Sequence, residues 1–366
     1  MRIRIITCHD VYNFGASLQA YALQEYLRSA GHIVEIIDYK PDYLSRHFRL
    51  TAIENPQYDK CIIKFLYLLA KLPGRLYALK RKASFDRFTK SYLLLTKRQF
   101  HSNEELKEDK SDIDAYIAGS DQIWNTYFNN GRDSAFYLDF VPKGKIKISY
   151  AASFATADII PQYREFVRKM LDRFDMVTVR EKKSLPLLYS LGRTDAIAVC
   201  DPVFLLDDSS WQVLIKGYKK YPEKYMLVYD SEKSDTLKQV ALEIAKNLQL
   251  KIYNVSTAKL GYADKNLRNS SPLDFLNLII QAQYVISNSF HASAFSILFH
   301  KQFCVVNRTE KINIRMESLL SDYNLSDRLV ANFSSQLLTP IDYQLIDSML
   351  EEDVKKSKLF LSSVLS

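Results

Sequence analysis

The spacing of hydrophobic residues changes between two periods along the chain, which predicts strands alternating with helices. An isoleucine-rich stretch at 2–8 indicates a buried strand. Small and aliphatic residues then recur at intervals of three and four over 16–30, the period of a helix, and Gly31 ends that helix. A second strand is expected at 32–39. The chain therefore opens with a βαβ unit, as a Rossmann-like sheet does.

The same alternation continues in two successive runs. In the first run we expect further strands at 113–118, 146–151, 176–179 and 196–200. The periodicity fades over 205–223, and new strands are expected at 225–229, 251–255, 284–286 and 303–306. The chain therefore predicts an α/β protein with two Rossmann-like domains. We place them at 1–204, joined by a C-terminal helix within 341–366, and at 222–335.

Residues 41–103 interrupt the strands of the first domain. Apolar residues recur there at helical spacing among many cations, so we expect a basic helical insert over this range. One interpretation is a helical subdomain. The other is an amphipathic surface that contacts anionic lipid headgroups.

Composition excludes some classes of function. Among the 366 residues, 50 Lys and Arg stand against 42 Asp and Glu, and the cations are dispersed. This charge suits an anionic small molecule or membrane surface and does not favour nucleic acid. The four cysteines show no CxxC spacing, which argues against a zinc site or a disulfide framework. The chain starts with a strand rather than a signal peptide and lacks a stretch apolar enough for a membrane helix, so we expect a cytoplasmic protein.

Polar residues follow several predicted strands where each ends, the edge at which open α/β sheets bind ligands. His291 falls in the first turn of a predicted helix, where free N–H groups favour an anion; a cap or a packed side chain is the other reading. Ser120 and Asp121 follow another strand and suit a ligand or a helix N-cap. Arg180, at a strand tip, can hold a carboxylate or phosphate or form a salt bridge to a neighbouring acid.

Five motifs stand in order along the first 320 residues: NFGASLQAYALQEYLRSAGHIVEIIDY at 13–39, AGSDQIWN at 118–125, VTVREKKS at 177–184, ISNSFHASAFSILFHKQF at 286–303 and NIRMESLL at 313–320. Together they resemble the polysaccharide pyruvyl transferase family. The resemblance implies a GT-B-like fold, with two Rossmann-like domains facing a cleft. It also implies that phosphoenolpyruvate, the donor substrate, gives its pyruvyl carbon to two hydroxyls of one sugar, forming a cyclic ketal and releasing phosphate. No cofactor and no metal are expected.

The resemblance also assigns roles to residues. His291 is expected to act as the acid at the pyruvyl donor or to hold the departing phosphate. Asp121 is the candidate general base or sugar-hydroxyl ligand from its position after a strand, and not from the family pattern. Donor-binding residues are expected to be Arg180, Arg315, Ser289 and Asn288, and acceptor-binding residues Asn13, Ser120, Gln122 and Ser153. The acceptor would be a sugar or lipid-linked oligosaccharide from a capsule or exopolysaccharide precursor.

The chain departs from the family pattern beside the histidine. Some members have the sequence D-R-L-H where this chain has Asn288-Ser289-Phe290-His291. The missing cation calls for another, and Arg315 downstream is the candidate. Two other functions stay open: a nucleotide-sugar glycosyltransferase of the same architecture, and a non-catalytic carbohydrate- or membrane-binding scaffold.

Overall fold

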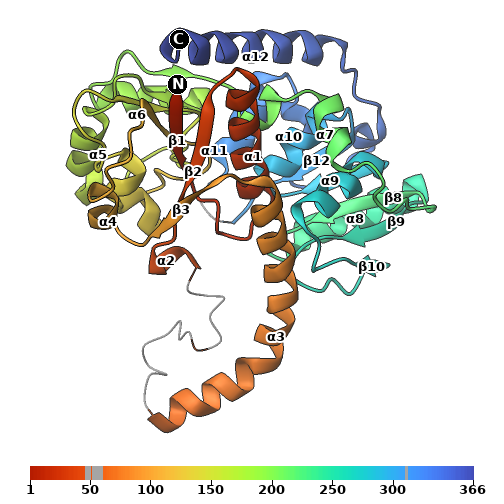
Figure 1. Cartoon of the computed structure of the whole chain (residues 1–366). Helices are drawn as coiled ribbons and strands as arrows, with labels where there is room; N and C mark the ends of the chain where they lie inside the picture. Colours follow the sequence, from red (N-terminus) through yellow and green to blue (C-terminus); the bar gives the residue numbers. More distant parts are fainter. Residues whose placement is uncertain (46–50, 52–60, 310–311) are drawn as a thin grey trace.

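Two parallel β-sheets lie side by side, with helices packed around both (Figure 1). The computed structural model describes residues 1–45, 51, 61–309 and 312–366. Central strands such as β1 (Arg2–Ile6) and β8 (Tyr225–Tyr229) are almost wholly buried. Strands covered by helices on both faces are near-continuous apolar runs, and this explains why the sequence pattern located them. None of the helices over the described ranges is both long and apolar enough to cross a bilayer.

The N-terminal sheet has the strand order β3-β2-β1-β4-β5, and all pairs are parallel. Its other strands are β2 (Ile33–Tyr39), β3 (Leu95–Phe100), β4 (Ala115–Ala118) and β5 (Ile146–Ser149). Two short strands, β6 (Thr178–Val179) and β7 (Ile197–Ala198), continue the edge beyond β5 through isolated bridges. The helices of this half are α1 (Phe14–Ser29), α2 (Asp42–Ser45), α3 (Cys61–Tyr92), α4 (Asn103–Lys107), α5 (Arg164–Leu171) and α6 (Leu185–Ser190).

The C-terminal sheet has the order β10-β9-β8-β11-β12-β13 and is also parallel. Its further strands are β9 (Lys251–Asn254), β10 (Lys265–Asn266), β11 (Tyr284–Ser287), β12 (Gln302–Val306) and β13 (Leu329–Val330). Its helices are α7 (Asp208–Leu214), α8 (Asp235–Leu248), α9 (Pro272–Gln281), α10 (Phe290–Leu298) and α11 (Ile314–Asp322). The α/β class with two parallel sheets is thus confirmed.

The last helix, α12 (Gln344–Val364), returns to the N-terminal half. The Cys200 backbone N–H donates to Ser357 Oγ at 2.9 Å, and Lys182 lies 3.2 Å from Asp353. The expected attachment of the C-terminal helix to the first domain is consistent with these contacts. The domain boundaries themselves stay a prediction.

The helical insert was predicted too long. Helix α3 ends at Tyr92, and Leu95–Phe100 forms β3, an edge strand paired with β2. The prediction of helix up to residue 103 is therefore wrong over these residues. The centre of β3 is charged and exposed, as edge strands often are, so its sequence lacks the apolar alternation that marks a strand. Residues 46–50 and 52–60 of the predicted insert lie outside the described residues.

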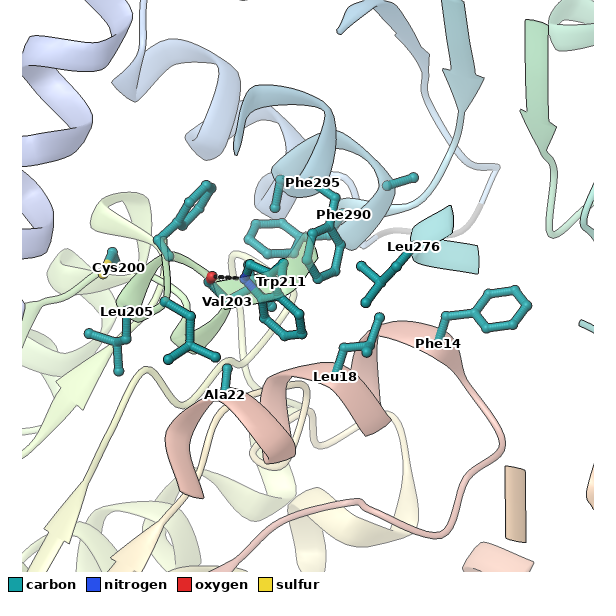
Figure 2. Packing of buried hydrophobic residues seen from close by; sticks show 14 of the residues in the cluster. Phe14, Leu18, Ala22, Cys200, Val203, Leu205, Trp211, Leu276, Phe290 and Phe295 are labelled. Carbon is teal, nitrogen blue, oxygen red and sulfur yellow. Dashed lines mark hydrogen bonds between the residues drawn. The ribbon is translucent and has the colours of Figure 1, made fainter. Parts of the chain in front are cut away.

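An apolar core joins the two halves at the base of the site (Figure 2). Phe14, at the start of α1, stacks on Phe275 of α9 with ring centroids 4.5 Å apart. Trp211 of α7 is fully buried between the halves, and its indole N–H donates to the Val203 carbonyl at 3.1 Å. Because α1 packs directly on helices of the other half, its N-terminus has a fixed place beside the C-terminal sheet.

Candidate active site

The loop after β11 places Ser289 and His291 at the carboxyl edge of the C-terminal sheet. Strand β11 ends at Ser287 and α10 begins at Phe290. Ser289 is the N-cap residue, yet its half-buried side chain makes no capping hydrogen bond. The first amide groups of α10 therefore keep their positive potential for another acceptor.

The N-terminus of α1 covers one side of the His291 imidazole. Asn13 caps α1, because its side chain accepts the Gly15 N–H at 2.9 Å. A Cβ atom on Gly15 would lie 1.9 Å from His291 Nδ1, far inside van der Waals contact. Glycine is required at this position, since only a residue without a side chain lets the two helix N-termini meet at the imidazole.

Asp201 connects His291 to the end of the N-terminal sheet. Its Oδ2 lies 2.9 Å from Arg180 Nη1 and 3.5 Å from His291 Nε2, and it accepts the Ser120 hydroxyl at 3.2 Å. Burial opposes ionisation of Asp201, yet His291 and Arg180 hold the pKa of its carboxyl well below its usual range. Asp201 is thus a buried anion at the centre of the site. It follows a predicted strand, and that position was the signal available in the sequence.

Arg180 is buried and held on three sides. Its Nε donates to Glu181 Oε1 at 2.9 Å, and its guanidinium lies 3.8 Å from the centroid of the Phe290 ring. The hydroxyl of Ser153 donates to the same Glu181 oxygen at 2.9 Å. The salt bridge that the sequence left open for Arg180 is therefore present, to Asp201 and Glu181 together.

Three buried polar atoms of this cluster lack a hydrogen-bond partner among the described residues. They are Arg180 Nη2, Glu181 Oε2 and His291 Nε2. The His291–Asp201 distance of 3.5 Å is within ion-pair range, but the pair lacks hydrogen-bond geometry. Buried polar atoms are normally satisfied, so unsatisfied donors and an acceptor gathered around one carboxylate point to a site that binds something polar.

Arg315 adds a second buried cation. It stands in the first turn of α11, is 5% exposed, and donates only to the Ile312 carbonyl, at 3.4 Å, among the described residues. Burial, with Arg180 nearby, lowers the pKa of Arg315 to about 10. A buried guanidinium without a carboxylate partner costs free energy in the ligand-free protein. Such a cost is expected where an anionic ligand supplies the missing charge.

Arg180, Arg315 and Asp201 line one pocket between the two halves. Its enclosed part measures about 30 Å³, enough for one water molecule. The side chain of His291 is not in the pocket wall and reaches this group through Asp201. A ligand with two anionic groups therefore requires the side chains around Arg315 to move apart.

Two predicted site residues lie close to this cluster with their side chains less constrained. Asp121 has a left-handed backbone with φ of 73°, and its half-buried carboxylate makes no hydrogen bond or ion pair to the described residues. Asp121 acts on Arg315 in the opposite direction to burial, since its charge favours the protonated guanidinium. Gln122 is half-buried, and its Oε1 accepts the Asn125 amide at 3.1 Å.

Three other predicted site residues are occupied within the protein. The Asn288 side chain accepts from Ser231 and donates to Asp230 at 3.0 Å, which ties the loops after β11 and β8 together. The Ser120 and Ser153 hydroxyls are fully buried and donate to the two acids of the cluster, Asp201 and Glu181. Within the described residues, no group of three or more His, Cys, Asp or Glu side chains is arranged to hold a metal ion.

A family model described as polysaccharide pyruvyl transferase matches residues 13–310. The chain belongs to the polysaccharide pyruvyl transferase family. It is therefore a pyruvyl transferase, and the family implies phosphoenolpyruvate as donor and a polysaccharide as acceptor. The match spans the residues that carry His291, Arg180 and Asp201. No curated protein matches the sequence.

Solved structures show how widely this architecture is used. The pyruvyl transferase is similar to Staphylococcus aureus MnaA with UDP, at a TM-score of 0.52 and 12% identity over 97% of this chain and 90% of the other. For a putative UDP-N-acetylglucosamine 2-epimerase from Listeria monocytogenes the TM-score is 0.53 and the identity 10%, over 99% of this chain and 95% of the other. For the UDP-N-acetylglucosamine 2-epimerase from Rickettsia bellii the TM-score is 0.51 and the identity 12%, over 100% of this chain and 94% of the other. At these identities the likeness shows the GT-B-like fold alone and does not favour the glycosyltransferase alternative.

Proposed function

We propose that this pyruvyl transferase forms a cyclic ketal on one sugar of a surface-polysaccharide precursor. One sugar hydroxyl adds to C2 of phosphoenolpyruvate while the methylene carbon takes a proton and becomes a methyl group. A second hydroxyl of the same sugar then displaces phosphate from C2, and its proton leaves with the phosphate. Two C–O bonds form, one C–O bond breaks, and no oxidant or cofactor is needed.

The observation that carries the proposal is the buried charge of Arg315 beside the His291 and Asp201 cluster. Phosphoenolpyruvate has a carboxylate and a phosphate, so its site needs two cationic groups. Arg180 is already paired with acids, whereas Arg315 has no carboxylate partner among the described residues. We assign Arg315 to a donor anion, and this also supplies the cation that is missing at Ser289.

His291 has the place of an acid in this scheme. Its imidazole lies between two helix N-termini and next to an ionised Asp201, and its Nε2 has no hydrogen-bond partner within the part of the chain that the structure describes. A positioned histidine can protonate the methylene carbon or the leaving phosphate oxygen. Ser289 and the first amides of α10 would hold phosphate, as helix N-termini commonly do. Asp121, with its unengaged carboxylate, is the proposed base for a sugar hydroxyl.

We place the acceptor in a second pocket, beside the start of α1. Its walls include Tyr12, Tyr77, Arg81 and Arg268, and its volume is about 320 Å³. Arg81 is 6% exposed and donates only to backbone carbonyls among the described residues, and none of the described lining residues is acidic. Two tyrosines suit stacking on a sugar ring, and two arginines suit the phosphate groups of a lipid-linked oligosaccharide.

This acceptor pocket revises the predicted acceptor contacts. Tyr12 of the pocket wall precedes Gly15 by three residues, so one loop borders both the pocket and the His291 imidazole. Asn13 is exposed at this loop and stays a proposed contact. Ser120 and Ser153 are proposed instead to position Asp201 and Glu181. The protein would work in the cytoplasm, at the inner face of the membrane that carries a lipid-linked acceptor.

Calorimetric titration with phosphoenolpyruvate tests the donor site. We expect binding by the native protein, and loss of binding in Arg315→Met. The matched control is Arg328→Met, because Arg328 is equally buried but hydrogen-bonded to the Leu337 and Thr339 carbonyls. Equal binding by the native protein and Arg315→Met would remove Arg315 from the donor site.

Steady-state kinetics test the acceptor pocket. Arg268→Met is expected to raise KM for the acceptor roughly tenfold or more while leaving KM for phosphoenolpyruvate unchanged, because a charge-assisted contact to phosphate is worth about 1.5 kcal/mol or more. The control is Arg164→Met, an exposed arginine that donates to Ser190. A change in the donor KM instead of the acceptor KM would contradict this placement.

A further inference from the structure

The first half of α3 projects away from both sheets (Figure 1). Large apolar side chains lie exposed along it, which is unusual on the surface of a globular protein. Their exposed fractions are 44% for Ile63, 62% for Phe65, 58% for Leu66, 49% for Leu69, 36% for Leu72, 50% for Leu76 and 37% for Tyr77. These are seven of the twenty large hydrophobic residues exposed over the described parts of the chain.

Four of the exposed apolar residues and three of the cations lie in separate rows along this helix. Phe65, Leu69, Leu72 and Leu76 follow one another at intervals of four, three and four, which aligns them in one stripe. Lys64, Lys71 and Arg75 follow the same kind of spacing about a quarter of a turn or more away. Residues 61–82 hold six Lys and Arg and no acid. The segment is therefore an amphipathic helix whose charge is entirely positive.

We propose that this segment of α3 is a docking helix that lies on an anionic lipid surface. The apolar stripe would enter the boundary between headgroups and acyl chains, and the cations beside it would meet anionic headgroups. The positive charge of this segment favours an anionic lipid surface over a second copy of this chain as its partner. A second copy of this chain would bring its own α3 cations, such as Lys64, Lys71 and Arg75, against those of the first, which disfavours pairing of two α3 helices.

The direction of α3 agrees with this role. In Figure 1 the free half of the helix points away from the end of the N-terminal sheet at which β1 starts, and toward the side where its parallel strands end. Gly74, Tyr77 and Ala78 of the same helix line the pocket that we assign to the acceptor. Docking through α3 would bring that pocket to the membrane surface. The docking itself goes beyond the proposed function and stands without it.

Vesicle co-sedimentation of the full chain tests the docking helix. We expect the protein to sediment with vesicles of phosphatidylcholine and phosphatidylserine and to stay in solution with phosphatidylcholine alone. The bound fraction should fall as salt is raised, because the lipid charge is screened. Equal binding to both kinds of vesicle, or to neither, would overturn the proposal.

Matched variants locate the contact. Phe65→Ser with Leu69→Ser should weaken binding at least tenfold, since each removed apolar group contributes to insertion. The control is Leu345→Ser with Leu359→Ser, two leucines that are each 59% exposed on α12. Circular dichroism confirms that each variant is folded. If both pairs weaken binding equally, or neither does, α3 is not the docking element.

Charge variants and the oligomeric state complete the test. Lys71→Ala with Lys80→Ala should weaken binding to anionic vesicles about thirtyfold, because each basic residue near the surface contributes roughly 1 kcal/mol. Lys216→Ala with Lys246→Ala, on other exposed surfaces, should not. Light scattering of native protein and the Phe65→Ser, Leu69→Ser variant should give the same mass. A native dimer that the variant breaks, without vesicle binding, would mean that a second copy covers this face.

Discussion

Arg315 has no carboxylate partner among the described residues, and this buried charge should make the stability of the protein depend on its donor. Replacing Arg315 with methionine removes a buried charge but keeps most of the aliphatic volume. The lowering of the pKa of Arg315 to about 10 corresponds to a cost of roughly 3 kcal/mol of folding free energy for burying the charge. Arg315→Met should therefore raise the free energy of unfolding of the ligand-free protein by about 1 to 3 kcal/mol.

Thermal unfolding measures this gain directly. For a chain of 366 residues the expected rise in Tm is about 1 to 4 °C. Phosphoenolpyruvate at a hundred times its Kd should stabilise the native protein by about 2.7 kcal/mol and Arg315→Met not at all. Arg328→Met is the control, and it should lower Tm because it leaves two backbone carbonyls and Asp327 without their partner. A lower Tm for Arg315→Met than for the native protein would show that the buried charge of Arg315 does not destabilise the ligand-free fold.

The pH dependence of this difference follows from the same pKa. Below about pH 10 Arg315 is charged in both the folded and unfolded chain, so the full cost is present. Above that pH the folded chain loses the proton first, while the unfolded chain keeps it to a higher pH, because the pKa of Arg315 is lowered only in the folded chain. The advantage of Arg315→Met over native protein should therefore be constant at neutral pH and shrink above pH 10. Chemical denaturation at neutral pH and above pH 10 checks the sign.

Further predictions concern the residues around His291. Gly15→Ala should lower kcat about a hundredfold, because its Cβ must displace the imidazole, whereas Gly261→Ala, with nothing within 4 Å of its Cβ, should leave kcat unchanged; equal activity of the two variants in a phosphate-release assay would contradict the contact. Asp201→Asn should destabilise the fold by about 3 to 5 kcal/mol in urea denaturation, because Arg180 loses a buried partner. If the denaturation midpoint of Asp201→Asn equals that of the native protein, the ion pair does not carry this energy.

The sequence predicts the fold well wherever burial is two-sided. Strands such as β8 and β11 are continuous apolar runs, and the entry to α9 is marked by a capping box between Ser271 and Asp274. The strand β3 escaped prediction, because the exposed middle of an edge strand needs no apolar residues. The predicted helical insert included the residues of β3, but helix α3 ends at Tyr92 and β3 begins at Leu95.

The candidate site is harder to predict, because its residues come from separate strand ends. His291, Arg180 and Asp121 follow or end predicted strands, and Asp201 follows a predicted strand in the same way, but this position alone does not separate a site residue from other polar residues at strand ends. The contact between Gly15 and His291 depends on the packing of α1 against the other half, which no local pattern encodes. A sequence also does not show which polar side chains are already hydrogen-bonded within the folded protein. This is why Asn288 seemed free to bind a donor, although its amide joins two loops.

Transfer of the pyruvyl group from phosphoenolpyruvate to a sugar can be observed directly. The native enzyme is incubated with phosphoenolpyruvate labelled with ¹³C at C2 and a panel of lipid-linked and synthetic glycosides, and phosphate release is followed together with the ¹³C spectrum. If the enzyme forms a ketal, we expect phosphate release and a new ketal carbon attached to one sugar, and we expect both to be lost in His291→Ala. Unchanged phosphoenolpyruvate across the panel, with sugar transferred from a nucleotide donor instead, would contradict it.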